Sequence, residues 1–178
     1  MSNGSGTYVI LAKDDAERKR LDDGYRYLKE HLRRGRTIYD ETLVLPENAV
    51  VLDVGTGSGA WILDLACIVP SSVVIHGIDL SSTFFPHIQS PRNQNIHLSV
   101  NSCTSLPEDW SNSFDLVNQS LLMGAITRDE WRQNLLEVYR VLKPGGRVQL
   151  FEADIISLES QPGTACEKLR LIYGRNIA

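Results

Sequence analysis

A short apolar run followed by a glycine-rich turn constrains the fold of this chain more than any other stretch. Residues 50–54, Val-Val-Leu-Asp-Val, are apolar and mostly β-branched, which predicts a buried strand. Gly55, Gly57 and Gly59 follow at alternate positions, and an apolar helical pattern begins near Trp61. A strand, a glycine turn and a helix in this order form a cradle for a nucleotide. The glycines let a ligand approach the backbone, and the start of the helix offers free N–H groups.

Two acidic residues bear on which nucleotide fits this cradle. Asp53 lies two residues before the first glycine, where a carboxylate repels a pyrophosphate and attracts a cation. S-adenosylmethionine carries a sulfonium and an ammonium and no phosphate, so it suits this turn better than a dinucleotide does. Asp79 ends the next apolar run and can accept hydrogen bonds from the ribose hydroxyls of either cofactor.

Two other interpretations of the turn stay open at this point. Gly55, Gly57 and Ala60 also satisfy the degenerate dinucleotide pattern G-x-G-x-x-G/A, which is typical of nicotinamide-dependent oxidoreductases. The turn can also be a tight connection with a surface aspartate and no ligand.

Apolar runs and helical patterns alternate along the chain, which predicts an α/β fold with a parallel sheet. The expected strands are residues 50–54, 73–78, 95–100, 114–118 and 147–151, and the expected helices are residues 14–34, 61–69, 127–142 and 161–173. Asn118 and Gln119 are expected at the start of the loop beyond the fourth strand. Ligands of open α/β sheets sit at such strand ends.

The order of the motifs resembles that of class I S-adenosylmethionine-dependent methyltransferases, which have a Rossmann-like sheet. The motifs are Asp53-x-Gly55-x-Gly57-x-Gly59, Asp79, Leu106-Pro107, residues 114–117 and residues 142–146. Tyr8, residues 17–21, residues 121–126, Trp131 and residues 149–152 point more narrowly to a fungal secondary-metabolism group that includes global regulators and small-molecule methyltransferases.

This resemblance implies a set of cofactor-binding residues. They are Tyr8, Asp53, Gly55, Thr56, Gly57, Gly59, Trp61, Asp79, Leu80, Ser102, Cys103, Asn118 and Gln119. Ser102 stands where the family commonly has an acidic residue, so its hydroxyl would contact the adenine without a charge. Neither a catalytic residue nor a metal site is assigned. Glu152 is expected at the exit of the fifth strand, where it could face the acceptor.

The resemblance also implies a division of the chain and a gap in the sheet. Residues 1–13 are expected to be a flexible segment, 14–48 a helical lid and 49–178 the methyltransferase core. Five parallel strands can be assigned, whereas the usual C-terminal hairpin of strands 6 and 7 has no matching pattern. We therefore expect a homodimer or a partner chain to complete the sheet edge.

Composition limits the remaining function classes. The formal net charge of −4 disfavours nucleic acid as a partner, and no apolar run or signal layout indicates a membrane or secretion. A cytoplasmic protein is expected, or a nuclear one if it acts as a regulator. Lys29, Arg33, Arg34 and Arg36 form a basic cluster that is expected to be a solvated helix end.

Two functions remain in view. The first is methyl transfer from S-adenosylmethionine to a small-molecule, secondary-metabolite-like acceptor. The alternative is a catalytically weak regulatory or scaffolding protein that binds the cofactor and acts through a partner chain.

Overall fold

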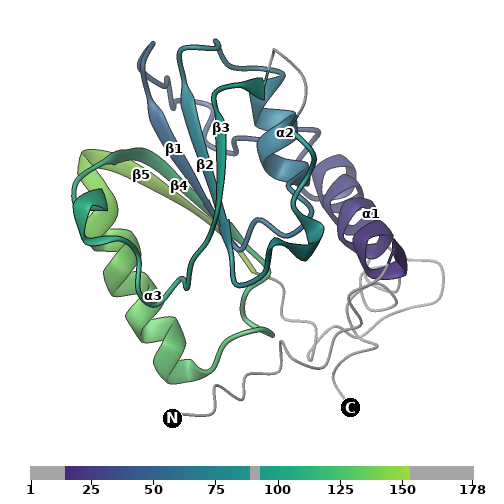
Figure 1. The fold of residues 1–178 in the computed structure, drawn as a ribbon. Helices are drawn as coiled ribbons and strands as arrows, with labels where there is room; N and C mark the ends of the chain where they lie inside the picture. The colour runs from purple at the N-terminus through teal and green to yellow at the C-terminus, as the bar shows by residue number, and fades with distance from the viewer. Residues whose placement is uncertain (1–14, 89–92, 153–178) are drawn as a thin grey trace.

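Five parallel strands form one twisted sheet in the order β3-β2-β1-β4-β5, seen in a computed structural model that describes residues 15–88 and 93–152 (Figure 1). The strands are β1 (Val50–Val54), β2 (Val74–Asp79), β3 (Ile96–Val100), β4 (Phe114–Ser120) and β5 (Leu142–Phe151). The helices are α1 (Asp15–His31), α2 (Ala60–Ala66) and α3 (Arg128–Val141), with short 3₁₀ turns at Ser82–Phe84 and Glu108–Trp110. The predicted α/β class and the five parallel strands are confirmed.

Helices cover both faces of the sheet, with α1 and α2 on one side and α3 on the other (Figure 1). Successive side chains of a strand point to opposite faces, so neighbouring residues of β1 belong to different cores. Val51 packs with Ile62 and Leu65 of α2, whereas Leu52 packs with Val138 of α3. A central strand that is buried on both faces explains the continuous apolar run in the sequence.

The order in which strands are added to the sheet changes side between β3 and β4. It runs from β1 outward to β2 and β3, then returns to place β4 beside β1. The register pairs Asp53 of β1 with Asn118 of β4 at the carboxyl ends of these strands. Open α/β sheets bind ligands at such a switch point, so the topology places the site beside the glycine turn.

Two strand boundaries differ from the sequence-based expectation. β4 continues through Ser120, so Asn118 and Gln119 lie in the strand and not in a loop. β5 begins at Leu142, so residues 142–146, expected as a turn, lie within the strand: Leu142 pairs with Phe114, and the regular register resumes at Arg147, opposite Leu116. The pairing of Leu142 with Phe114 therefore lies outside the apolar run at 147–151 from which the strand was predicted.

β5 is the outer strand of the described sheet beyond β4. Val148 and Leu150 on this strand are 45% and 41% exposed. The expectation that a partner chain or a second copy completes this edge stays a prediction. The expected helix at 161–173 and the flexible segment at 1–13 lie outside the described residues. No helix of the described part is long and apolar enough to cross a bilayer.

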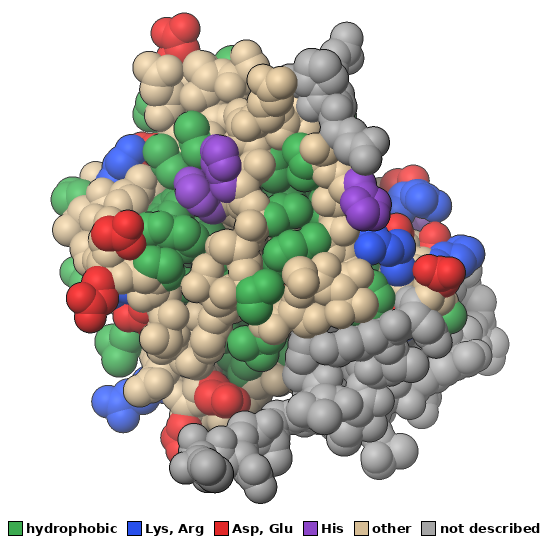
Figure 2. Space-filling view, in the orientation of Figure 1, with side chains coloured by type: hydrophobic (Ala, Val, Ile, Leu, Met, Phe, Trp, Pro, Cys, Tyr) green, Lys and Arg blue, Asp and Glu red, His purple; other side chains and the backbone are tan. Residues whose placement is uncertain are grey.

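One carboxylate of α2 accepts hydrogen bonds from α1 and from the segment that follows α1. Asp64 of α2 accepts hydrogen bonds from Tyr25 (2.6 Å), from Lys29 (2.7 Å) and from the Thr37 hydroxyl. Burial raises the pKa of Asp64, but these three hydrogen bonds outweigh it and leave the pKa below its usual value. Other charged residues of α1 are exposed and gather at the right of Figure 2.

Asp64→Ala is expected to lower the free energy of unfolding by roughly 1–2 kcal/mol at pH 7, because three donors lose one acceptor. A lowered folded-state pKa stabilises the fold above the unfolded pKa and is lost as pH falls through the folded value. The difference between wild type and Asp64→Ala should therefore shrink in acid. Urea denaturation measures it. Asp23→Ala, which removes a carboxylate at the exposed surface of α1, is the control. An equal loss in both variants would contradict the assignment.

Candidate functional site

The turn after β1 needs glycine at three positions. Gly55, Gly57 and Gly59 have φ values of 72°, 53° and 76°, in the left-handed region that side-chain-bearing residues rarely adopt. A Cβ at Gly55 would lie 2.7 Å from Leu122 Cδ2, and one at Gly59 would lie 2.7 Å from Pro86 Cγ. Both the backbone conformation and the close packing therefore exclude larger residues here.

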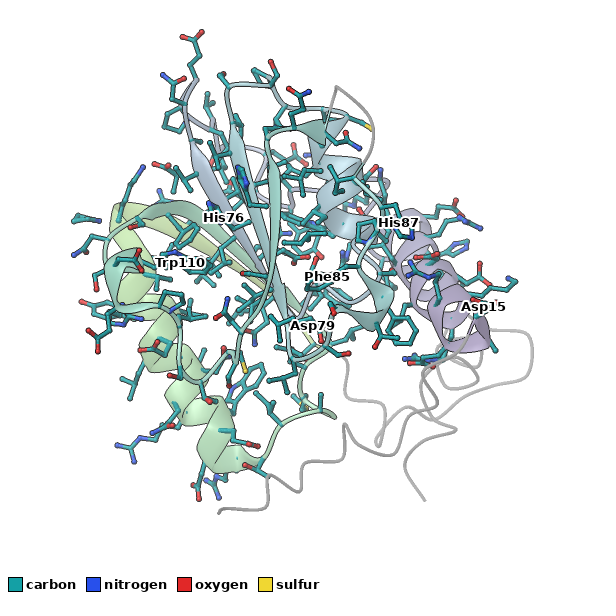
Figure 3. All side chains as sticks on the ribbon, viewed as in Figure 1. Asp15, His76, Asp79, Phe85, His87 and Trp110 are labelled. Atoms are coloured by element: carbon teal, nitrogen blue, oxygen red, sulfur yellow. The ribbon has the colours of Figure 1, made fainter. Side chains whose placement is uncertain are left out.

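Asp79 lies at the carboxyl end of β2, beside the glycine turn (Figure 3). Its Oδ2 accepts the backbone N–H of Gly57 at 3.0 Å, and its Oδ1 accepts the N–H of Ser81 at 3.2 Å. The backbone N–H of Thr56 donates to the carbonyl of Ile78 at 2.8 Å. These bonds tie the turn to the end of β2 and hold a buried carboxylate at its rim.

A small hollow opens between the turn and the loop after β4. Its lining is mostly apolar, with one carboxylate. The lining residues are Gly55, Ile78, Asp79, Leu80, Asn101, Cys103, Leu122, Ala125 and Ile126. Apolar walls beside an acceptor for hydroxyl groups suit a flat base attached to a ribose.

The structure brings Asn101 and Cys103 to this hollow, and Ser102 is not among its lining residues. The Ser102 hydroxyl is within 2.8 Å of the Thr104 hydroxyl and accepts the backbone N–H of Thr104 at 3.2 Å. The expected contact of Ser102 with the base is therefore replaced by a local turn. Burial raises the pKa of the Cys103 thiol, which stays protonated and acts as an apolar wall.

Asp53 provides a second buried carboxylate, at the end of β1. Burial raises its pKa to about 6, and the hydrogen bond from Asn118 opposes the rise. The Asn118 Nδ2 donates to Asp53 Oδ1 at 2.6 Å. Near pH 7 the group is therefore an anion, and the glycine turn lies between the carboxylates of Asp53 and Asp79.

Two predicted site residues have side chains in the cores. Trp61 packs among the residues between the sheet and α2, and its indole N–H donates to the Thr37 carbonyl at 3.0 Å. Gln119 is fully buried and accepts a hydrogen bond from Asn134 of α3 at 2.8 Å. Both side chains pack the fold in this structure, and the expected contacts of these two residues with the cofactor stay predictions. Tyr8 lies outside the described residues.

Arg33 is buried, contrary to the expected solvated helix end. Its guanidinium is 4.4 Å from the centre of the Phe151 ring and 4.8 Å from that of Tyr39, and its Nη2 donates to the Ser120 hydroxyl at 3.1 Å. The expectation holds better for Arg36, which pairs with Glu41 at the surface. Tyr39 is near in sequence, but Phe151 and Ser120 are remote, so the sequence around Arg33 does not reveal the enclosure that buries it.

The remaining candidate for chemistry has a structural role, and the histidine of β2 lies away from the site. Glu152, expected to face the acceptor, accepts the backbone N–H groups of Leu122 and Met123, each at 3.0 Å. It thereby holds the loop that places Leu122 over Gly55. His76 lies farther back along β2, where it packs against Trp110, away from Asp79 (Figure 3).

The sheet, the glycine turn and the two carboxylates define a class I methyltransferase fold. A family model described as a methyltransferase domain matches residues 51–146, more than half of the chain. The chain belongs to this methyltransferase family, as the resemblance predicted.

Several of the curated relatives are fungal proteins. The chain is similar to the N-methyltransferase gliN of Aspergillus fumigatus, with 33% identity over 147 residues that cover 82% of this chain and 50% of the relative. The N-methyltransferase sirN of Leptosphaeria maculans is 31% identical over 85% of this chain and 51% of the relative. The secondary metabolism regulator laeA of Monascus pilosus is 30% identical over 82% of this chain and 37% of the relative. The chain spans about half the length of gliN and sirN.

Solved structures share the fold. A methyltransferase from Aquifex aeolicus, described as dependent on S-adenosylmethionine, superposes with a TM-score of 0.58 at 21% identity, covering 92% of this chain and 87% of that one. PKMT2 from Rickettsia typhi, in complex with S-adenosylhomocysteine, superposes with a TM-score of 0.53 at 25% identity, covering 68% of this chain and 23% of that one. The family match and the complex of PKMT2 with S-adenosylhomocysteine identify S-adenosylmethionine as the cofactor.

The residues present fit this cofactor. The glycine turn leaves backbone open to a ligand at Gly57, where a Cβ would have Leu21 Cδ1 as its nearest neighbour, at 3.4 Å. Asp79 lies where it can accept ribose hydroxyls, the hollow beside Leu80 suits the base, and Asp53 offers an anion to the cationic part.

Proposed function

We propose that this domain transfers a methyl group from S-adenosylmethionine to a small-molecule acceptor of secondary metabolism. The observation that carries the proposal is the pair of buried carboxylates, Asp53 and Asp79, on either side of the glycine turn. An anionic cradle favours a sulfonium and an ammonium and disfavours a pyrophosphate. The names of the relatives gliN and sirN support a nitrogen atom as the acceptor.

The residues of the chain contribute mainly by positioning. When bound, the cofactor would supply an activated methyl group for in-line transfer to a nucleophile, with S-adenosylhomocysteine as the leaving group. The glycine turn and Asp79 would hold the nucleoside, and Asp53 would hold the ammonium. Leu80, Leu122 and Ile126 would keep water from one side of the base. Placing two reactants in line supplies much of the rate of such a transfer, so an uncharged amine acceptor needs little further help.

Calorimetry of the purified chain with S-adenosylmethionine and with NADH tests the cradle. Binding of the first and no binding of the second is the expected result, and the reverse would replace the methyltransferase by an oxidoreductase. A screen of small amines with detection of S-adenosylhomocysteine tests the transfer. Turnover with any amine supports the proposed acceptor class, and turnover with hydroxyl acceptors alone would contradict it.

Affinity for S-adenosylmethionine is expected to fall as pH falls through about 6, because Asp53 becomes protonated there. The sign follows from the charge: the ionised carboxylate attracts the ammonium, and the neutral acid does not. Calorimetric titrations between pH 5 and 7 measure the effect. Asp53→Asn should bind more weakly at pH 7 and lose this dependence. A wild-type affinity that stays constant from pH 5 to 7 would remove Asp53 from the site.

A regulatory or scaffolding role is the second candidate, and the exposed apolar residues of β5 favour it. Val148 and Leu150 lie on the outer strand of the described sheet, where a second copy or a partner chain could pair with it. The similarity to the regulator laeA agrees with this role. Cofactor binding without turnover on any acceptor, together with a dimer in light scattering, would favour it over the enzyme.

A further inference from the structure

A chain of two side-chain amides connects Asp53 to the segment after α1. Asn118 donates from Nδ2 to Asp53 Oδ1 at 2.6 Å, and its Oδ1 accepts from Gln149 Nε2 at 2.8 Å. Gln149 Nε2 also donates to the Thr37 carbonyl at 3.1 Å, and its Oε1 accepts the backbone N–H of Tyr39 at 2.8 Å. Asn118 and Gln149 are both buried, and they are register partners on β4 and β5.

The direction of this chain is set by the backbone. A carbonyl such as that of Thr37 only accepts, and an N–H such as that of Tyr39 only donates, so together they fix which end of the Gln149 amide faces which way. Gln149 must then present its N–H₂ to Asn118. The Asn118 side-chain oxygen accepts this hydrogen bond, so the Asn118 N–H₂ is left to donate to Asp53. A rotated Asn118 amide would instead point an oxygen at a carboxylate.

We propose that Gln149 is a positioning residue that orients Asn118 so that Asp53 stays an anion for the cationic part of the cofactor. This inference rests on the proposed function. It also connects the segment at Thr37 and Tyr39, which follows the helix α1, to the charge at the cradle. The same Thr37 carbonyl accepts the Trp61 indole N–H, so both Gln149 of β5 and Trp61 of α2 bond to this segment.

Other groups also face Asp53 and act on its ionisation. Asp79 raises the pKa of Asp53, whereas the Arg33 guanidinium lowers it. Tyr39 also faces Asp53, and its own pKa is raised to about 12, chiefly by burial, so it stays neutral across the range of interest. A test of the amide chain must therefore leave Asp79, Arg33 and Tyr39 in place.

Gln149→Glu is the first test, because it keeps the shape and removes the donor. Its carboxylate can still accept from Tyr39, but it repels the oxygen of Asn118 and favours the rotated amide. The rotated amide disfavours the ionised form of Asp53. We expect the midpoint of S-adenosylmethionine affinity against pH to rise by about one unit, which weakens binding roughly tenfold at pH 5 and little at pH 8.

Gln149→Leu separates the amide chain from the added charge. It removes the donor to Asn118 without a new carboxylate, so the midpoint should move in the same direction by a smaller amount. It also keeps the test available if Gln149→Glu does not fold. Thermal unfolding of each variant shows how much of any change is a loss of stability.

Asn134→Asp is the matched control. It places the same isosteric change in a fully buried amide that bonds Gln119 on the opposite face of the sheet. We expect lower stability and an unchanged midpoint. Weaker binding by the same factor at every pH in Gln149→Glu and Gln149→Leu, or an equal midpoint shift in Asn134→Asp, would overturn the proposal. Wild type that binds no S-adenosylmethionine at any pH would instead overturn the proposed function.

Discussion

Gly57→Val is expected to abolish S-adenosylmethionine binding while the sheet stays folded. The φ of 53° at Gly57 is a conformation that β-branched residues rarely adopt, at a cost of roughly 1–3 kcal/mol. A Cβ there would contact only the Leu21 side chain, at 3.4 Å, so the backbone can accept one carbon. The two further methyl groups of valine would fill the space over the turn. We expect affinity to fall by at least about a hundredfold in calorimetry.

Gly145→Val separates the strain from the blocked cradle. Gly145 has a φ of 83° and no heavy atom within 4 Å of its Cβ position, and it lies on β5, away from the turn. Both variants should lose a similar amount of stability, measured by thermal unfolding, but only Gly57→Val should lose the cofactor. Normal binding by Gly57→Val would show that the turn is not the cradle.

The part of this site that the sequence predicted is encoded locally. The apolar run of β1, the glycines and Asp79 lie within thirty residues, and each has a short-range cause. A buried central strand must be apolar, and a turn with φ near 70° must be glycine. The start of α3 also has a local cause, because Thr127 and Glu130 form a capping box.

The sequence-based expectation for Asn118 and Gln119 was wrong about where β4 ends, and the end of the strand decides which face of the sheet each side chain lies on. Asn118 and Gln119 were expected together in a loop at the ligand. Because β4 continues through Ser120, the alternation of the strand sends Asn118 to Asp53 and Gln119 to Asn134, on opposite faces. An error of two residues in a strand end therefore put together two side chains that lie on opposite faces.

Other features depend on partners that are remote in the sequence. Arg33 is buried because Tyr39 and Phe151 stack on it, and Phe151 is 118 positions away. Gln149 is functional in our proposal only because β5 pairs with β4 in one register. Composition and periodicity around a residue do not contain such pairings, so Arg33 has the local sequence of a solvated cation.

Asp79→Ala is expected to weaken S-adenosylmethionine binding by roughly tenfold to a hundredfold, which corresponds to about 1.5–3 kcal/mol. The ribose hydroxyls would lose a charged acceptor at the rim of the hollow. The backbone N–H groups of Gly57 and Ser81 would lose theirs too, because both donate to this carboxylate. Asp79→Asn should bind with intermediate affinity, since its amide oxygen can still accept one of these bonds.

The two causes can be separated with an analogue of S-adenosylhomocysteine that lacks the ribose 2′-hydroxyl. Wild type should bind the analogue more weakly than S-adenosylhomocysteine, because one acceptor position of Asp79 then has no partner. Asp79→Ala has already lost that bond, so it should bind the two ligands with equal affinity. A loss that is the same in wild type and in Asp79→Ala would mean that Asp79 only holds the turn at Gly57. In that case the ribose contact must come from another residue of the hollow, and Asn101 is the polar side chain that lines it beside Asp79.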